Sequence, residues 1–213
     1  MLKILIIDDH EVARIGVTRL LESEEFTIVG AAESGDRALE LLGGDLSVDA
    51  VVMDIRMPGT DGLVTLSRIK ELRPTLPVIL LTAYENPTYV ARAAALGAAD
   101  YVLKGVGFAS IRESLQRATA GDNLLPHSPI ALVRRVMREN VDTSKLPDGF
   151  PLTAREAQVL RHIALGLNNK EIARSLGISV ETVKEHVQNI LRKLKANDRT
   201  DAAVRAIKSG IVS

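Results

Sequence analysis

Residues Ala50–Gly62 read AVVMDIRMPGTDG, and the architecture of the first half of the chain can be worked out from them. Four apolar residues run directly into one carboxylate, Asp54, and Pro58, Gly59 and Gly62 then indicate a turn. A short apolar run that ends at turn residues is typical of a strand buried on both faces, as in parallel sheets. We therefore expect Asp54 at the carboxyl end of a strand, where open α/β sheets bind their ligands.

Two further carboxylates are expected beside Asp54. The chain begins with the apolar run LKILII, which ends at Asp8 and Asp9. Neighbouring parallel strands would bring the three acids into one crevice, where they repel one another unless a cation is bound. Oxygen ligands without cysteine or clustered histidine favour Mg²⁺. One such Asp alone is equally well explained as a helix N-cap or turn residue, and His10 is interpreted as a packing or capping residue rather than a ligand.

Length and charge indicate two domains of different character. The chain has 213 residues, which favours two domains, and its 27 basic and 27 acidic side chains cancel. Residues 1–124 hold 12 basic and 18 acidic side chains, whereas residues 152–213 hold 11 and 6. The first part suits a cation and the second a polyanion. The absence of cysteine excludes disulfides, thiolate metal sites and thiol nucleophiles.

The sequence gives no sign of a membrane segment. The chain enters a predicted strand at once rather than a signal peptide, and no apolar run reaches the roughly 18 residues of a membrane span. We expect a cytoplasmic protein without a membrane partner.

Strand and helix patterns alternate five times up to about residue 120. Such βα alternation predicts a doubly wound, five-stranded parallel sheet with right-handed crossovers. The expected strands are Leu2–Ile7, Thr27–Ala31, Ala50–Met53, Val78–Leu81 and Tyr101–Leu103, and the expected helices lie near residues 11–22, 35–42, 61–72, 87–96 and 108–120.

The polar residues at the strand ends suit phosphoryl transfer. Thr82 follows the fourth predicted strand and Lys104 the fifth. A carboxylate can attack phosphorus if a cation offsets the charge, and the acyl phosphate then needs a hydroxyl and an ammonium group near its oxygens. These residues make Asp54 the expected nucleophile, Asp9 and Asp54 the cation ligands, and Thr82 and Lys104 the partners of the phosphoryl oxygens.

The motifs IIDDH, DIRMPGTDG, LLTA and DYVLKG, in this order, resemble the receiver domain of two-component response regulators over roughly residues 1–120. The resemblance implies a flavodoxin-like fold and a Mg²⁺-dependent phosphoacceptor. Many receivers have proline after the lysine, whereas Gly105 follows here, and we expect no cis bond at this place because a non-proline cis bond is costly. The implied roles are Asp54 as phosphoacceptor; Asp8, Asp9, Asp54 and the Arg56 backbone carbonyl as metal ligands; and Thr82, Lys104 and Tyr101 as phosphoryl-contacting or switch residues. For Tyr101, an ordinary strand aromatic remains the alternative.

A linker is expected over residues 122–150. Ser128 and Pro129 favour a helix start, with a capping hydroxyl before proline, and the helix should extend over about 129–140. Its apolar residues face one side, and Arg134, Arg135 and Arg138 face the other. Such a charged face is more typical of a solvated surface than of DNA contact.

Residues 151–213 predict an all-α domain of four helices. The first begins at a Thr153–Glu156 capping box, the second spans Asn169–Leu176 and ends at Gly177, the third runs from Ser179 to about Lys195, and the fourth spans Arg199–Ser209. Two helices joined by a short glycine-containing turn are typical of a helix-turn-helix. The third helix would bury one apolar stripe and present a polar face to the major groove.

Residues Leu152–Ala203 resemble the LuxR-type helix-turn-helix over their whole length. The resemblance implies DNA binding, with Lys184, Glu185 and Gln188 at groove-facing positions and Lys170, Thr182 and Arg192 at phosphates. Glu185 departs from what DNA favours, because an acid repels phosphate unless it accepts from a cytosine amino group. The last helix presents Ala203, Val204 and Ile207, which either pair two subunits or pack on their own domain.

Together the two resemblances imply a response regulator of the NarL/FixJ type, a phosphorylation-controlled transcriptional regulator and not an enzyme. A histidine kinase would phosphorylate Asp54, and the resulting homodimer would bind two half-sites of promoter DNA, with RNA polymerase as a further candidate partner. An atypical receiver controlled by dimerisation or a ligand is the alternative. Three other classes of protein are less favoured. An aspartyl-phosphate phosphohydrolase would need a second acid at the position of Arg56, and a sigma-factor-like protein would leave the receiver residues unexplained. A lactone-sensing regulator would need an aromatic ligand pocket, which a content of 3% aromatic residues does not favour.

Overall fold

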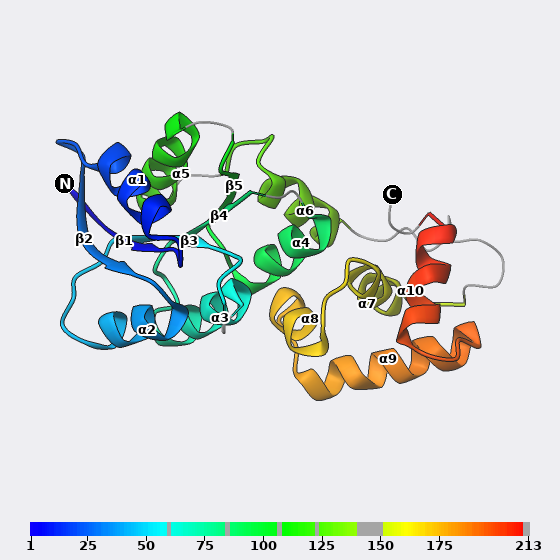
Figure 1. Cartoon of the computed structure of the whole chain (residues 1–213). Helices are drawn as coiled ribbons and strands as arrows, with labels where there is room; N and C mark the ends of the chain where they lie inside the picture. Colours follow the sequence, from blue (N-terminus) through cyan, green and yellow to red (C-terminus); the bar gives the residue numbers. More distant parts are fainter. Residues whose placement is uncertain (59–60, 84–85, 106–107, 122–123, 140–150, 211–213) are drawn as a thin grey trace. The chain divides into compact units, whose positions relative to one another are not determined.

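The computed structural model describes residues 1–213 except 59–60, 84–85, 106–107, 122–123, 140–150 and 211–213 (Figure 1). The chain forms two compact units. The first comprises residues 1–86 and 96–132, and the second comprises residues 87–95 and 133–213. Each unit is described by itself below.

The first unit contains the predicted five-stranded parallel sheet. Its strand order is β2-β1-β3-β4-β5, so the chain reverses its winding direction between β1 and β3. Almost every residue of the three central strands is buried, which explains why they appear in the sequence as continuous apolar runs. The strands are β1 Leu2–Ile7, β2 Phe26–Ala32, β3 Ala50–Asp54, β4 Val78–Thr82 and β5 Asp100–Leu103.

The strand ends extend slightly further than the sequence predicted. Asp54 is the last residue of β3, paired with Leu81, and Thr82 is the last residue of β4, paired with Leu103. The backbone N–H of Ile55 still donates to the Leu81 carbonyl at 3.2 Å. Both polar side chains are therefore held by the sheet itself rather than by the loops that follow. The described residues contain no cis peptide bond, as expected for Lys104–Gly105.

Five helices follow the strands, as predicted. They are α1 Glu11–Leu21, α2 Gly35–Gly43, α3 Gly62–Leu72, α4 Pro87–Leu96 and α5 Phe108–Ala120. Figure 1 shows α1 and α5 on one face of the sheet and α2 and α3 on the other. The core between the sheet and the pair α1 and α5 is formed by Ile4, Ile6, Leu21, Phe26, Ile111 and Leu115 among others.

Gly62 allows α3 to begin directly behind the end of β3. The Gly62 N–H donates to the Ile55 carbonyl at 2.9 Å, and Asp61 caps α3 by accepting from the Leu63 N–H at 3.0 Å. A β-carbon at Gly62 would lie 2.7 Å from the Asp54 carbonyl oxygen and from the Ile55 α-carbon. Only glycine permits this close approach.

Buried Asp100 ties the start of the linker helix α6, Pro129–Arg138, to the sheet. Its carboxylate accepts from the Ser114 hydroxyl and from the Ser128 hydroxyl, both at 2.6 Å, and from the Tyr101 N–H at 2.8 Å. The sequence predicted the helix start at Pro129 correctly, but the Ser128 hydroxyl donates to Asp100 across 28 positions. The helix ends at Arg138, slightly before the predicted end near Asn140, and Asn140 itself lies outside the described residues.

The second unit contains the four predicted C-terminal helices. They are α7 Ala154–Ala164, α8 Asn169–Leu176, α9 Val180–Leu194 and α10 Arg199–Lys208. Both α7 and α8 begin at capping boxes, Thr153 with Glu156 and Asn168 with Glu171. Gly177 ends α8 with a φ of 64°, a left-handed conformation that glycine adopts without strain. The turn from α8 to α9 is therefore the predicted helix-turn-helix.

Small and apolar side chains hold these helices together. Of the stripe predicted on α9, Val183, Ile190 and Leu194 are buried as expected, whereas the fourth member, Val187, is only partly buried. Arg161 on α7 donates to the Val136 and Glu139 carbonyls at 2.8 and 2.7 Å, so it satisfies acceptors at the carboxyl end of α6.

No helix of the described chain combines the length and apolar character that crossing a membrane requires.

Candidate cation site and nucleic-acid interface

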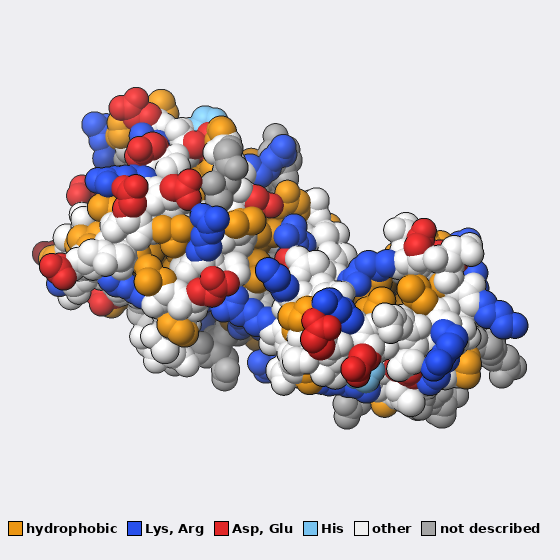
Figure 2. Space-filling model, turned by 90° about the horizontal axis from the view of Figure 1, so that it is seen from below, with side chains coloured by type: hydrophobic (Ala, Val, Ile, Leu, Met, Phe, Trp, Pro, Cys, Tyr) orange, Lys and Arg blue, Asp and Glu red, His pale blue; other side chains and the backbone are white. Residues whose placement is uncertain are grey.

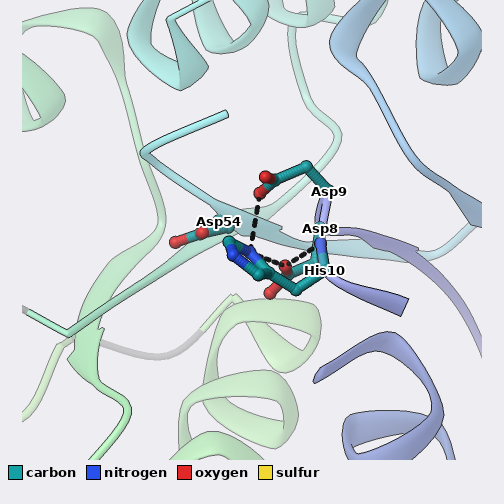
Figure 3. Close-up of side chains that lie close together, drawn as sticks. All are labelled: Asp8, Asp9, His10 and Asp54. Atoms are coloured by element: carbon teal, nitrogen blue, oxygen red, sulfur yellow. Dashed lines mark hydrogen bonds and ion pairs between the residues drawn. The ribbon is translucent and has the colours of Figure 1, made fainter. Parts of the chain in front are cut away.

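Four side chains that can coordinate a metal ion meet where β1 and β3 end. Asp8, Asp9 and His10 follow β1, and Asp54 ends β3. Each offers one ligand atom, and these atoms lie within 4.8 Å of one another. Figure 3 shows the His10 ring beside the carboxylates of Asp8 and Asp9. The cluster lies where the strand order reverses, the place at which doubly wound sheets bind ligands.

Asp54 is the buried member of this cluster that the sheet orients most directly. It is 6% exposed, and its Oδ1 atom accepts from the Ile55 backbone N–H at 2.9 Å. Oδ2 lies 3.3 Å from the Lys104 ammonium. Burial raises the pKa of Asp54 above its ordinary value, nearby Asp8 raises it further, and Lys104 opposes both effects. The carboxylate is thus short of compensating positive charge, as expected for a site that takes a cation.

Lys104 compensates part of the negative charge. Its ammonium donates to Asp8 Oδ2 at 2.7 Å, and its backbone N–H donates to the Thr82 carbonyl at 2.7 Å, which fixes the loop after β5 to the end of β4. Burial lowers the pKa of Lys104, but its bond with Asp8 and the charge of Asp54 outweigh that effect and raise the pKa. Lys104 therefore remains charged beside the two acids.

His10 is the member of the site that the sequence analysis missed. Its Nδ1 atom lies 3.1 Å from Asp9 Oδ1 and 3.5 Å from Asp8 Oδ1. It occupies the N-cap position of α1 but makes no capping hydrogen bond with its side chain, so the interpretation as a capping residue was wrong. Its position directly after the acid pair was the signal available in the sequence.

The other residues predicted for the site lie around the cluster. Thr82 and Tyr101 are buried, 3% and 2% exposed, in the neighbouring strands β4 and β5. The Arg56 side chain is exposed two residues after Asp54. Three carboxylates, two of them buried, form an oxygen-rich donor set that fits a divalent cation.

The predicted DNA-facing residues lie on exposed surface of the helix-turn-helix. Lys184, Glu185, Gln188 and Arg192 are exposed on α9, opposite its buried stripe, while Lys170 is exposed at the start of α8. Thr182 is partly buried in the first turn of α9, and its hydroxyl lies 2.8 Å from that of Ser179. These six residues therefore belong to the two helices that a helix-turn-helix places on DNA.

The exposed face of α9 carries both charges. Lys184 pairs with Glu181 at 2.8 Å, and Arg192 donates to Asn189 Oδ1 at 2.8 Å. Figure 2 shows acidic and basic side chains side by side over the helical domain. An exposed ion pair of this kind contributes little to stability, so the Lys184 ammonium can leave Glu181 for another acceptor at little cost.

On α10 the structure separates inward from outward residues. Ala202 and Ala206 are fully buried and pack against the domain, whereas Val204 and Ile207 are 43% and 55% exposed and Ala203 is partly buried. Val204 and Ile207 therefore leave about half of their surface open to solvent.

Comparison with known families finds two matches in different parts of the chain. Residues 4–116 match the family described as the response regulator receiver domain. Residues 151–206 match the family described as bacterial regulatory proteins, luxR family.

Similar proteins match over the whole chain. The transcriptional regulatory protein LnrK of Bacillus subtilis is 35% identical, with 99% of each chain covered. The transcriptional regulatory protein YdfI of the same organism is 36% identical, covering 100% of this chain and 99% of that protein. A solved structure of RcsB from Salmonella enterica serovar Typhimurium, bound to promoter rprA in the presence of the phosphomimetic BeF₃⁻, has 25% identity and a TM-score of 0.54, covering 95% of this chain and 96% of that one.

Proposed function

The chain belongs to the response regulators that join a receiver domain to a LuxR-type DNA-binding domain and is thus a phosphorylation-controlled transcriptional regulator, and we propose that Asp54 is its phosphoacceptor. The observation that supports this residue is its position: a buried carboxylate, at the end of a central strand, beside two further acids and one ammonium group. We assign residues 1–121 to the receiver, 122–150 to the linker and 151–213 to the DNA-binding domain.

The phosphoryl group would come from a phosphohistidine of a histidine kinase. A carboxylate oxygen of Asp54 forms the new O–P bond while the P–N bond breaks, and the electron pair of that bond returns to the imidazole of the kinase. The chain turns over no separate substrate in this proposal, and its chemistry is confined to gaining and slowly losing the phosphoryl group.

A divalent cation, Mg²⁺ in this proposal, supplies positive charge that offsets the phosphoryl oxygens as they approach the acids. Asp8, Asp9, Asp54 and the backbone carbonyl of Arg56 are the residues that would hold it. Lys104 and the Thr82 hydroxyl would receive the oxygens of the new acyl phosphate, and both already lie at the same edge of the sheet.

Tyr101 is the proposed second switch residue. It lies in β5 opposite Leu80, close in the ladder to Thr82, so a shift of the Thr82 hydroxyl toward a phosphoryl oxygen would change the packing next to Tyr101. Phosphorylation would then act as a population shift, favouring a state that dimerises and binds DNA.

The output would be binding to promoter DNA as a homodimer on two half-sites. Lys184, Glu185 and Gln188 would contact bases, while Lys170, Thr182 and Arg192 would contact phosphates. The likeness to the RcsB structure bound to promoter rprA supports DNA as the partner. Val204 and Ile207 are the proposed dimer contacts on α10, and contact with RNA polymerase is a further proposal.

The phosphoacceptor is tested by intact mass after treatment with a small acyl phosphate and Mg²⁺. The wild-type chain should gain one phosphoryl group, Asp54→Asn none, and the exposed control Asp36→Asn one. A phosphorylated Asp54→Asn chain would overturn the assignment of Asp54.

The switch is tested by sedimentation and by DNA affinity, with and without the same phosphoryl donor. The wild type should dimerise and bind promoter DNA more tightly when phosphorylated. Asp54→Asn should show neither change when the phosphoryl donor is added. Full phosphorylation with unchanged DNA affinity would contradict the proposed coupling and favour control by a ligand or by dimerisation alone.

A further inference from the structure

His10 occupies a helix N-cap position without serving as a cap. Residues with short polar side chains are preferred there because they accept from the first helical N–H groups. The His10 side chain makes no such bond, is 72% exposed, and directs Nδ1 at the acid pair instead. Its contacts are with Asp9 at 3.1 Å and Asp8 at 3.5 Å.

Nitrogen groups lie at different oxygens of the acid pair. Lys104 approaches Asp8 Oδ2, and His10 approaches Asp8 Oδ1 and Asp9 Oδ1. The His10 backbone N–H also donates to Asp8 Oδ1 at 2.9 Å. The imidazole thus lies beside Asp8 Oδ1 and Asp9 Oδ1, whereas Lys104 lies beside Asp8 Oδ2.

The backbone beneath this group is held in place. Arg14, one turn into α1, donates from Nη1 to the carbonyls of Asp8 and Asp9 at 2.7 and 3.1 Å. A metal site needs such support, because a site whose ligand side chains become ordered only on binding has a lower affinity for the ion. With this backbone held, the His10 ring can turn toward an ion bound by the acids, while the Lys104 ammonium yields its place at Asp8 and Asp54.

We propose that His10 is a nitrogen ligand which lets the cation site of this chain bind first-row transition metal ions such as Ni²⁺ in competition with Mg²⁺. Imidazole favours Ni²⁺, Zn²⁺ and Cu²⁺, whereas Mg²⁺ prefers oxygen ligands, so His10 discriminates between the two classes. An ion bound by His10 and the acids occupies the carboxylates that Mg²⁺ needs. This inference rests on the cation site of the proposed function.

Isothermal titration calorimetry of the untagged full chain with NiCl₂ and with MgCl₂ tests the proposal without any activity measurement. His10→Ala should bind Ni²⁺ at least about tenfold more weakly than the wild type, while its Mg²⁺ affinity stays within about twofold. His10→Gln, which offers a polar amide toward Asp9 but has no ring nitrogen, should behave in the same way. Excess MgCl₂ should displace Ni²⁺ from the wild type.

The exposed His127, outside the cluster, provides the matched control, and His127→Ala should retain the Ni²⁺ affinity of the wild type. Equal Ni²⁺ affinity in the wild type and both His10 variants would overturn the inference, as would Ni²⁺ that Mg²⁺ does not displace. Failure of the wild type to bind Mg²⁺ is a different result, which would contradict the cation site of the proposed function.

Discussion

The electrostatic balance at Asp54 depends mainly on Lys104, which lies close to both Asp54 and Asp8. Lys104 serves both acids, at 2.7 Å from Asp8 and 3.3 Å from Asp54, so in the structure it takes part of the role that a bound cation would have. A divalent ion entering the cluster therefore meets carboxylates whose charge is already partly compensated. Lysine and metal compete electrostatically for the same oxygens.

Lys104→Ala should therefore tighten Mg²⁺ binding. We expect about fivefold higher affinity, since the partly exposed ammonium opposes the cation by about 1 kcal/mol. Calorimetric titration with MgCl₂ measures this, with Lys3→Ala as a control away from the cluster. Weaker Mg²⁺ binding in Lys104→Ala would mean that Lys104 orders the acids more than it competes with the ion.

Glu156 illustrates a charged group that stabilises the helical domain. It is 4% exposed, closes the capping box of α7, and accepts from the Lys193 ammonium at 2.7 Å. Burial raises its pKa, but the hydrogen bonds from Lys193 and Thr153 outweigh burial, so the pKa lies below the ordinary value of 4.5. A lowered carboxyl pKa stabilises the fold above the ordinary pKa, and this contribution is lost as the pH falls through the folded value.

Glu156→Gln should reduce the stability of the helical domain by roughly 1–2 kcal/mol at pH 7, because glutamine keeps the cap but not the charge-assisted bonds. The difference from the wild type should shrink as the pH falls below about 4.5. Urea unfolding followed by resolved amide signals of α7 measures both. A difference that does not depend on pH would rule out the charge of Glu156 as its cause.

At the level of elements, the connection from β3 to α3 fixes where Asp54 lies. The helix starts so close to the strand end that Gly62 has no room for a side chain. The position of Asp54 and the start of α3 are therefore coupled through backbone packing. This explains a glycine that the sequence analysis treated only as a turn residue.

Gly62→Ala should lower the free energy of unfolding by about 1–3 kcal/mol, because the added methyl group displaces the backbone of Asp54 or Ile55. Gly16→Ala in α1 is the matched control: nothing lies within 4 Å of its added β-carbon, and alanine favours helix, so this variant should be as stable as the wild type or more stable. Scanning calorimetry of both variants compares them. Equal stability of the Gly62→Ala chain would show that the backbone relaxes freely at the site.

At the scale of the whole molecule, the proposed mechanism has the receiver and the DNA-binding domain act together through a dimer. A dimer of helix-turn-helix domains favours two half-sites whose centres lie about 10 base pairs, or a multiple of that, apart. The exposed Val204 and Ile207 on α10 provide the apolar surface proposed for this contact.

Ile207→Asp should weaken binding of the phosphorylated chain to a two-half-site operator by about 100-fold, since linked binding is lost, but leave binding to one half-site unchanged. Leu72→Asp, which replaces a residue of similar exposure in the receiver, is the control and should bind both DNAs as the wild type does. Electrophoretic mobility shift with both DNA lengths measures the effect. An unaffected Ile207→Asp chain would place the dimer contact elsewhere.

The sequence by itself determined the order and type of the elements. Buried parallel strands appear as apolar runs, and helices are marked by their caps and periodicity, so β1 to β5 and α7 to α10 were predicted within a few residues. The acids at Asp8, Asp9 and Asp54 were predicted to meet because strand ends of a parallel sheet share one edge. These features depend on local patterns and on a rule of topology, which are both visible in a linear sequence.

Only the tertiary structure decided which side chains contact one another. Sequence patterns do not show which partner a side chain contacts. Three contacts could not be predicted for this reason: the His10 ring with Asp9, the Ser128 hydroxyl with Asp100, and the Lys193 ammonium with Glu156. The last two pairs are 28 and 37 positions apart. Their geometry is fixed by the packing of whole elements, because a buried carboxylate must find its donors wherever the fold brings them.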